Sequence, residues 1–321
     1  MRVERLLGHP IITSGTHPSI GKNIQGPSLI RVPDWVKSPL GRYYLYFADH
    51  KGSYIRLAYA DRIDGPWQVH PPGSLQLKDS QFPTEPPVPK PGEEIGFTGG
   101  GSVPGKRAHS AHAEASTPHI ASPDVHVNEN DQCIVMYFHG LESYGKQATR
   151  VAVSQDGINF SAKSEILGRT YFRVFEYEGY LYALAMPGQF YRSRNRYTNF
   201  EMGPLLFNQD MRHSALFVRD GELQVFWTQV GLAPETIMLS TIDLSGDWMS
   251  WKETAPVEVL RPEHDWEGAD APLEPSIRST AYGHVNQLRD PAVYIENGMI
   301  YLLYAVAGES GIAAARIELD G

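Results

Sequence analysis

The sequence predicts an all-β fold, a β-propeller of five blades with four antiparallel strands in each blade. The first observation is a repeated unit: a short strand, a turn with Gly or Asn, and a second strand rich in Tyr, Phe and Leu. Its five copies start at Gly26, Ser122, Tyr171, His213 and Asp290. The second observation is that a further strand and an Asp-Gly or similar turn follow each copy. The third is that no convincing amphipathic helix of ordinary length interrupts the pattern.

The blades follow one another along the chain. The first contains GPSLIRVP, RYYLYFAD and IRLAYADRIDGPW, and the second contains SPDVHVN, CIVMYF and TRVAVSQDGINF. The third contains YFRVFEYEGYLYALA and a weaker FYRSRNRYTNF. The fourth contains HSALFVRDGELQVFW and IMLSTIDLSGDW, and the fifth contains DPAVYIENGMIYLLY and IAAARIELDG. An aromatic residue after these turns can fill the space between neighbouring sheets.

The fifth unit ends after its third strand. The segment HPIIT at residues 9–13 can supply the missing fourth strand, so that an N-terminal strand closes the last blade. We therefore expect a single domain over residues 1–321, with a Pro- and Gly-rich insertion at about residues 71–117. An insertion of this length is typical of a functional segment, and we expect it to border the mouth of the propeller with little regular structure. The alternative fold is a β-sandwich, which regular repeats with matched turns do not favour.

Composition limits the partners. The formal net charge is −9 and no long basic run occurs, so nucleic acid and anionic membrane are not expected as partners. A sugar, or a neutral or cationic small molecule, fits this charge better. No apolar run could span a bilayer, and the N-terminus lacks the apolar segment of a signal peptide, which predicts a soluble, cytoplasmic protein. The single Cys133 allows no intrachain disulfide and fits a buried core position.

The candidate site follows from the geometry of a propeller. The inner strand of each blade starts at the same mouth that the second strand reaches when it ends. Asp290 and His213 occupy the same position in neighbouring blades, and Glu309 lies on a loop that returns to that position. We predict these three as catalytic residues. The predicted substrate-binding residues share the same mouth: Gln25, Asp49, His50, His119, His139, Glu142, Arg173, Gln189, Arg212, Gln229 and Arg289. The alternative is that such residues are plain solvated surface.

Two segments carry a resemblance to known families. GPSLIRVP followed by RYYLYFAD, and ASPDVHV followed by IVMYFHG, resemble the first two blades of the family 43 arabinanases and xylosidases. LRDPAVYIENGMIYLL resembles the Arg-Asp-Pro segment of the invertase-like family 32. The resemblance implies a five-bladed propeller that hydrolyses glycosides with two carboxylates about 5–9 Å apart.

The chain departs from that catalytic pattern. Gly26 stands before Pro27 where the resemblance implies an Asp, and the third blade offers Tyr171 where it implies a Glu. Glu176 and Glu178 lie near a turn at the wrong end of that blade. The resemblance therefore implies a glycosidase acting on an oligosaccharide in the central pocket with a non-standard catalytic set.

Three functions stay open. In a glycoside hydrolase, Asp290 would be the base or nucleophile and Glu309 or Glu142 the acid, with Arg289 and Arg212 as substrate clamps. His213 could replace the missing acid. The second function is a non-catalytic sugar-binding propeller. The third is a metal-assisted lyase or hydrolase. A glycoside hydrolase would require no cofactor. The metal-assisted enzyme would use a divalent metal held by histidines from the set His109, His112, His119 and His126.

Overall fold

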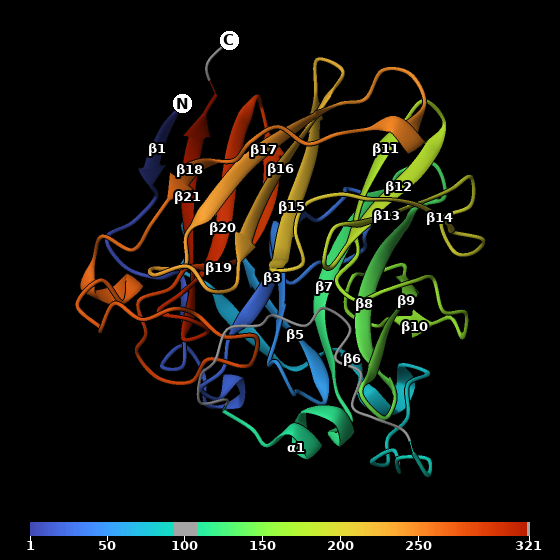
Figure 1. Ribbon diagram of the computed structural model, residues 1–321, viewed down its shortest axis with the longest axis horizontal. Helices are drawn as coiled ribbons and strands as arrows, with labels where there is room; N and C mark the ends of the chain where they lie inside the picture. The colour runs from blue at the N-terminus through green and yellow to red at the C-terminus, as the bar shows by residue number, and fades with distance from the viewer. Residues whose placement is uncertain (93–107, 320–321) are drawn as a thin grey trace.

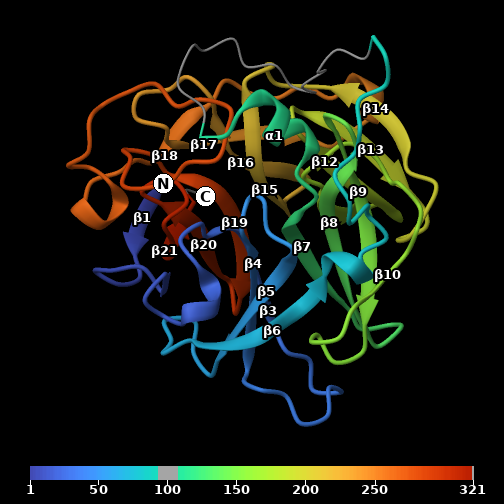
Figure 2. The ribbon, with the colours of Figure 1, turned by 90° about the horizontal axis from the view of Figure 1, so that it is seen from below.

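The computed structural model describes residues 1–92 and 108–319. Five antiparallel sheets succeed one another from the N-terminal to the C-terminal part of the chain, as the colours in Figures 1 and 2 show. The only α-helix among these residues is α1 (Ala111–Ser116), and the remaining helical turns are short 3-10 segments of three residues each. The predicted five-bladed propeller is therefore confirmed. None of the helices in the described parts is long and apolar enough to cross a membrane.

Each of the first four blades is a four-stranded sheet whose strands pair in sequence order. Blade one comprises β3 (Gln25–Arg31), β4 (Tyr43–Ala48), β5 (Tyr54–Ala60) and β6 (Gln68–Gln76). Blade two comprises β7 (Ile120–Asn128), β8 (Cys133–Ser143), β9 (Lys146–Ser154) and β10 (Ser161–Ala162). Blade three comprises β11 (Arg173–Tyr177), β12 (Tyr180–Ala185), β13 (Gln189–Ser193) and β14 (Glu201–Leu205). Blade four comprises β15 (Met211–Arg219), β16 (Glu222–Gln229), β17 (Ile237–Asp243) and β18 (Val257–Leu260).

Blade five is closed from the N-terminus, as the sequence predicts. It contains β19 (Arg289–Glu296), β20 (Met299–Val306) and β21 (Gly311–Glu318). Two N-terminal strands pair with β21: β2 (Ile12–Thr13), inside the expected segment, and β1 (Arg2–Arg5), which the sequence analysis did not identify. The longer pairing is made by β1. Its Arg5 is held by the buried carboxylate of Glu267, at 2.8 Å from Nε to Oε1, which fixes the strand against blade five.

A bulge recurs at the start of the inner strands. The pairing register between the first and second strands shifts just after Gln25, Ala121, Met211 and Arg289. The backbone has positive φ at the corresponding positions of four blades: Gly26, Ser122, Tyr171 and Asp290. A bulge redirects side chains and is frequent beside functional sites. The register shifts align Gly26, Ser122 and Asp290 as predicted. In blade four they place Arg212 at this position, so that His213 corresponds to Pro291 and the predicted alignment of that blade was wrong by one residue.

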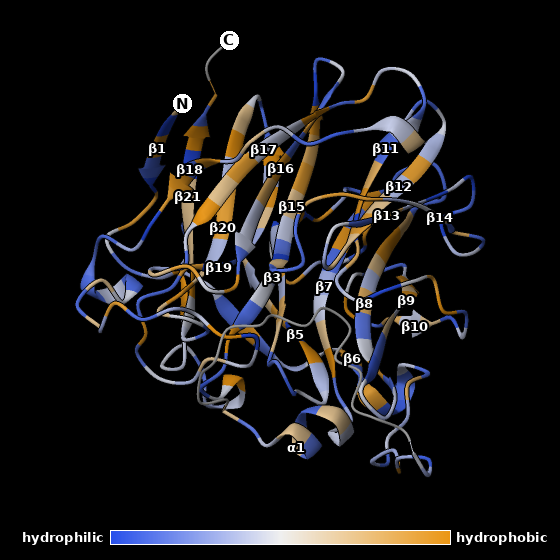
Figure 3. Ribbon diagram, in the orientation of Figure 1, coloured by the Kyte–Doolittle hydropathy of each residue, from blue (hydrophilic) through white to orange (hydrophobic). Residues whose placement is uncertain are grey.

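The core lies between the blades. Figure 3 shows apolar stretches along the strands and polar residues concentrated in the loops. The space between blades one and two is filled by aromatic side chains, among them Tyr46 and Phe160, whose rings meet edge to face at 5.8 Å between centroids. Phe160 follows the Asp-Gly turn of the second blade, where an aromatic residue was expected to fill the gap between sheets. Cys133 is also buried.

The predicted insertion begins as regular structure, because β6 continues to Gln76 and a 3-10 turn, Leu77–Asp79, follows it. Part of the segment lies outside the described residues. Its C-terminal part includes α1, which contributes Glu114 to the mouth of the propeller through an ion pair with Lys51, at 3.1 Å between Oε2 and Nζ. This part of the segment therefore borders the mouth.

Candidate functional site

The mouth where the inner strands begin holds a cavity of about 100 Å³. Gln25, Ser122, Tyr171 and His213 line it, each at or next to the start of an inner strand. His50, on the loop after β4, lines the same cavity. Residues from blades one to four, far apart in the sequence, thus meet in one place, because every inner strand starts there.

Asp290 lies directly behind Tyr171 and His213 and has no exposure to solvent. The Tyr171 hydroxyl donates to Asp290 Oδ1 at 2.8 Å. The Asp290 backbone N–H donates to His213 Nδ1 at 3.3 Å, and His213 Nε2 lies 3.5 Å from Asp290 Oδ1. The second carboxyl oxygen, Oδ2, is buried without a hydrogen-bond partner among the described residues. Burial raises the pKa of Asp290 and the charge of Glu309 raises it further, to about 6, so this carboxyl can hold a proton near neutral pH.

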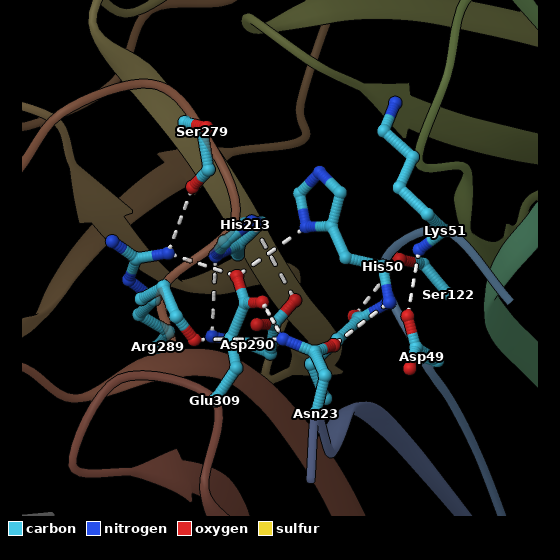
Figure 4. Close-up of polar contacts among 12 residues, drawn as sticks. Asn23, Asp49, His50, Lys51, Ser122, His213, Ser279, Arg289, Asp290 and Glu309 are labelled. Carbon is cyan, nitrogen blue, oxygen red and sulfur yellow. Dashed lines mark hydrogen bonds and ion pairs between the residues drawn. The ribbon is translucent and has the colours of Figure 1, made fainter. Parts of the chain in front are cut away.

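Glu309 is equally buried but fully partnered (Figure 4). Arg289 Nη1 lies 2.8 Å from Glu309 Oε1, and Asn23 Nδ2 donates to Oε2 at 2.6 Å. His50 Nδ1 is 3.3 Å from Oε1. Burial by itself would raise the pKa of Glu309, but the charges of His50 and Arg289 and the hydrogen bonds from His50 and Asn23 hold it at about 2. Glu309 is therefore an anion throughout the neutral range.

Asn23 fixes the position of His50 from two sides. Its side-chain oxygen accepts from the His50 backbone N–H at 2.8 Å, while its nitrogen donates to Glu309. The His50 imidazole is consequently held with Nδ1 toward Glu309 and with about a quarter of the side chain, 27%, exposed at the mouth. A histidine oriented by a buried carboxylate is an arrangement suited to general-base chemistry.

The two arginines predicted to clamp substrate are already occupied. Arg212 forms a two-point ion pair with Glu235, with Nε to Oε1 at 2.8 Å and Nη2 bonded to Oε2. Arg289 is shared between Glu309 and Gln287, and its Nε lies 3.6 Å from Glu235 Oε2. Arg289 has 1% exposure and does not line the cavity, whereas Arg212 does. Their role here is to balance buried carboxylates.

Glu235 was missed by the sequence analysis. It is fully buried, and although burial alone would raise its pKa, Arg212 and Arg289 lower it below the ordinary value. The signal was present, because Glu235 lies on the loop after the second strand of blade four, the same loop that begins beyond Gln229. Tyr171 was placed at the mouth by the alignment but was not included among the binding residues.

Two more histidines lie beside the cavity. His139 lines it and is 9% exposed, and its ring lies 6.3 Å from the rings of both His119 and Tyr171. Burial lowers the pKa of His139 to about 3 and that of His119 well below its usual value, so both are neutral. His119 Nε2 and His139 Nδ1 are buried without partners in the described residues. Both rings can therefore accept hydrogen bonds.

Arg173 lies deeper in the channel than the cavity. Its Nε donates to the Ser214 carbonyl at 2.9 Å and its Nη1 donates to the Pro123 carbonyl at 2.7 Å, which links the inner strands of blades two and four. Its guanidinium also sits 4.4 Å from the centroid of the Tyr171 ring. Arg173 therefore packs against the Tyr171 ring from inside the channel and helps to hold the ring in position.

The other predicted residues lie apart from the cavity lining. Glu142 pairs with Arg150 at 2.7 Å, and Asp49 accepts from the Lys51 backbone N–H at 2.9 Å. The Gln189 amide donates to carbonyls of its own blade, including Gly203 at 2.8 Å. Gln229 accepts from Asn208 at 2.8 Å. The loops were placed at the right mouth, but these side chains turn toward their own blades.

A metal site is not formed by the described residues in this state: residues 1–92 and 108–319 contain no group of three or more His, Cys, Asp or Glu side chains placed to hold an ion. His109 and Tyr282 meet edge to face instead, and His126 pairs with Asp124 at 2.7 Å near the opposite end of the channel. The four histidines considered as ligands are therefore divided between two ends of the channel.

Comparison with known sequences identifies the family of the chain. No family model matches the chain. It is 34% identical to the "Uncharacterized protein R118" of Acanthamoeba polyphaga mimivirus, in a match that covers 92% of this chain and 83% of the viral protein. The chain belongs to the family of this viral protein.

Solved structures show where the fold recurs. A GH43_1 enzyme from Xanthomonas citri superposes with a TM-score of 0.58 at 12% identity, covering 97% of this chain and 90% of that one. A family 43 β-xylosidase/α-arabinofuranosidase from a compost microbial metagenome, in complex with xylotriose, gives 0.57 at 11% identity and covers 100% and 96%. An N-acetylgalactosamine deacetylase from F. plautii gives 0.56 at 11% identity and covers 98% and 95%. The fold is thus that of the family 43 glycoside hydrolases, and it also carries other carbohydrate chemistry.

Proposed function

We propose that the protein hydrolyses a glycosidic bond of a saccharide bound in the mouth cavity, with Asp290 as the proton donor. The observation that carries the proposal is the state of the Asp290 carboxyl. It is buried beside the cavity, one oxygen lacks a partner, and its pKa is raised to about 6. A carboxyl whose pKa burial raises, so that it holds a proton in mildly acidic solution, is what a glycosidase needs to protonate the leaving oxygen.

This assignment reverses the roles expected from the sequence. Asp290 was expected to be the base or nucleophile and Glu309 the acid. Glu309 has a pKa of about 2 and donors on both oxygens, so it carries no proton to give. Its charge instead raises the pKa of Asp290. Glu142 is held in an ion pair by Arg150, which favours its ionised form and does not suit it as the acid either.

His50 is the base in this scheme. Its Nδ1 points to Glu309, which leaves Nε2 for a water molecule at the mouth. Nε2 takes a proton from the water, the water oxygen bonds to the anomeric carbon, and the bond to the leaving oxygen breaks as Asp290 gives up its proton. A single displacement by water inverts the configuration at the anomeric carbon.

The test uses a panel of 4-nitrophenyl glycosides of common pentoses, hexoses and uronic acids, with and without EDTA. Asp290→Asn should lower kcat on a cleaved substrate by on the order of a hundredfold or more, because the amide cannot donate the proton. Asp243→Asn, at the exposed end of β17, is the matched control and should be fully active. NMR of the first-formed sugar should show inversion. Equal kcat for Asp290→Asn would remove Asp290 from the mechanism, and loss of activity in EDTA would favour the metal-assisted alternative.

A non-catalytic sugar-binding propeller is the second candidate. It is favoured by the first blade, where a Cβ atom at Gly26 would lie only 2.9 Å from Ser122 Cα. The position where the resemblance implies an Asp therefore has no room for a side chain. Binding of a saccharide without turnover of any member of the panel would support this candidate.

A further inference from the structure

The ionised side chains around the cavity form pairs with one exception. Arg212 pairs with Glu235, Arg289 with Glu309, and Lys51 with Glu114. Each of these ion pairs is at least nine-tenths buried on both sides. Arg278, which also lines the cavity, has no such partner among the described residues. The cavity therefore holds one guanidinium without a carboxylate partner among these residues, although the whole chain has a net charge of −9.

Arg278 lines the cavity with an incompletely satisfied guanidinium. Its Nη2 donates to the Gln209 carbonyl at 2.9 Å, but Nη1 has only the sulfur of Met186, at 3.4 Å, which is a weak acceptor. Its Nε is buried without a partner. In the described parts of the chain no carboxylate forms an ion pair with it. Burial lowers the pKa of Arg278 to about 10, and the charge of Arg212 acts in the same direction. The charges of Asp210 and Glu235 offset only part of this effect, so an anion placed here would stabilise the guanidinium further.

We propose that Arg278 receives a carboxylate of the substrate, so that the ligand of this cavity is an acidic sugar, a uronic acid or its glycoside. The planar fork of an arginine matches a carboxylate, and a charge-assisted hydrogen bond in a partly buried site is stronger than one to a hydroxyl. A single unpaired cation calls for a single negative charge, which a uronic acid carries and a neutral pentose or hexose does not. The proposal rests on the same cavity as the proposed hydrolysis, but it concerns binding and not the chemical step.

Matched ligands isolate the carboxylate. Methyl glycosides of glucuronic and galacturonic acid are compared with methyl glucoside and methyl galactoside, which differ from them only at C6. Affinities are measured by calorimetry and by saturation-transfer NMR. Wild type should bind at least one acid tenfold or more tightly than its neutral counterpart. Arg278→Gln should remove that preference, and Arg278→Lys should keep part of it. Arg261→Gln, an exposed arginine paired with Glu258 outside the cavity, should behave as wild type.

The outcomes separate the two proposals. A preference for the acid that disappears in Arg278→Gln, with no turnover of any glycoside, would support acidic-sugar binding and contradict hydrolysis. Turnover of neutral glycosides, with equal affinity for acid and neutral ligands, would do the opposite. The inference is overturned if wild type binds none of the acids, if it shows no preference, or if the preference survives in Arg278→Gln. Circular dichroism of each variant confirms that the fold is retained.

Discussion

Replacing Asp290 with Asn should change the pH dependence of stability, independently of any substrate. The Asp290 carboxyl has an ordinary pKa of 3.8 when exposed and about 6 in the folded protein. A group whose pKa is raised by folding stabilises the folded state when it is protonated, and this contribution is lost as the pH rises through the folded pKa. A shift of this size corresponds to about 3 kcal/mol. The loss should fall between about pH 4 and pH 6 and should be absent in Asp290→Asn.

The assay is thermal unfolding of both proteins between pH 4 and pH 8. With an unfolding entropy of about 2.1 cal/mol/K per residue, 3 kcal/mol corresponds to about 4 °C for a chain of this length. The Tm of Asp290→Asn relative to wild type should therefore increase by about 4 °C from pH 4 to pH 8. The backbone at Asp290 has a φ of 49°, which Asn tolerates as well as Asp, so no strain is added. A Tm difference that stays constant across this range would show that Asp290 is not held protonated by its surroundings.

Two further changes test how the site is supported. Glu235→Gln should destabilise the protein by about 3–5 kcal/mol in chemical unfolding, because it leaves the buried Arg212 without its carboxylate, whereas Glu258→Gln, in an exposed pair with Arg261, should have no measurable effect. Gly26→Ala should lower the free energy of unfolding by more than the roughly 1–2 kcal/mol expected for an alanine at positive φ, because its Cβ would also meet Ser122. Gly298→Ala, at a φ of 76° with no atom nearby, measures the backbone strain alone. Equal losses of stability in the two variants would show that the contact with Ser122 is not tight.

The fold could be predicted because its signal is repeated. Five hairpins with turn residues at the same offset specify five similar sheets, and the register of each inner strand follows from its turn. The missing strand of blade five was harder to predict from the sequence. Residues 9–13 have the apolar character of a strand, and two of them do pair, but β1 is a polar segment with half-exposed residues. Its position depends on Arg5 and the distant Glu267, a contact that no local pattern reveals.

The candidate site could be predicted as a place but not as a set of contacts. Topology brings Asp290, His213 and His50 to one mouth, and the sequence alone supports that much. Whether an arginine meets a substrate or a buried carboxylate depends on side chains from other loops. Glu235 occupies Arg212, and Glu309 occupies Arg289, so the arginine left for a ligand is Arg278, on a long segment between blades four and five that the strand pattern does not describe.

The buried ion pairs at the mouth have a common effect on Asp290. Burial and the charge of Glu309 raise its pKa, while Arg289 and Arg212 act against them. Two unneutralised guanidinium groups this close would ionise the carboxyl and remove the proton that the proposed reaction needs. Glu235 holds Arg212 through both oxygens and also lies near Arg289, so it offsets the positive charge facing Asp290. Arg289 in turn keeps Glu309 ionised, and Glu309 raises the pKa of its neighbour. Buried pairs of this kind contribute little net stability, because desolvation offsets their attraction. Their arrangement is better explained by the proton on Asp290 than by the stability of the propeller.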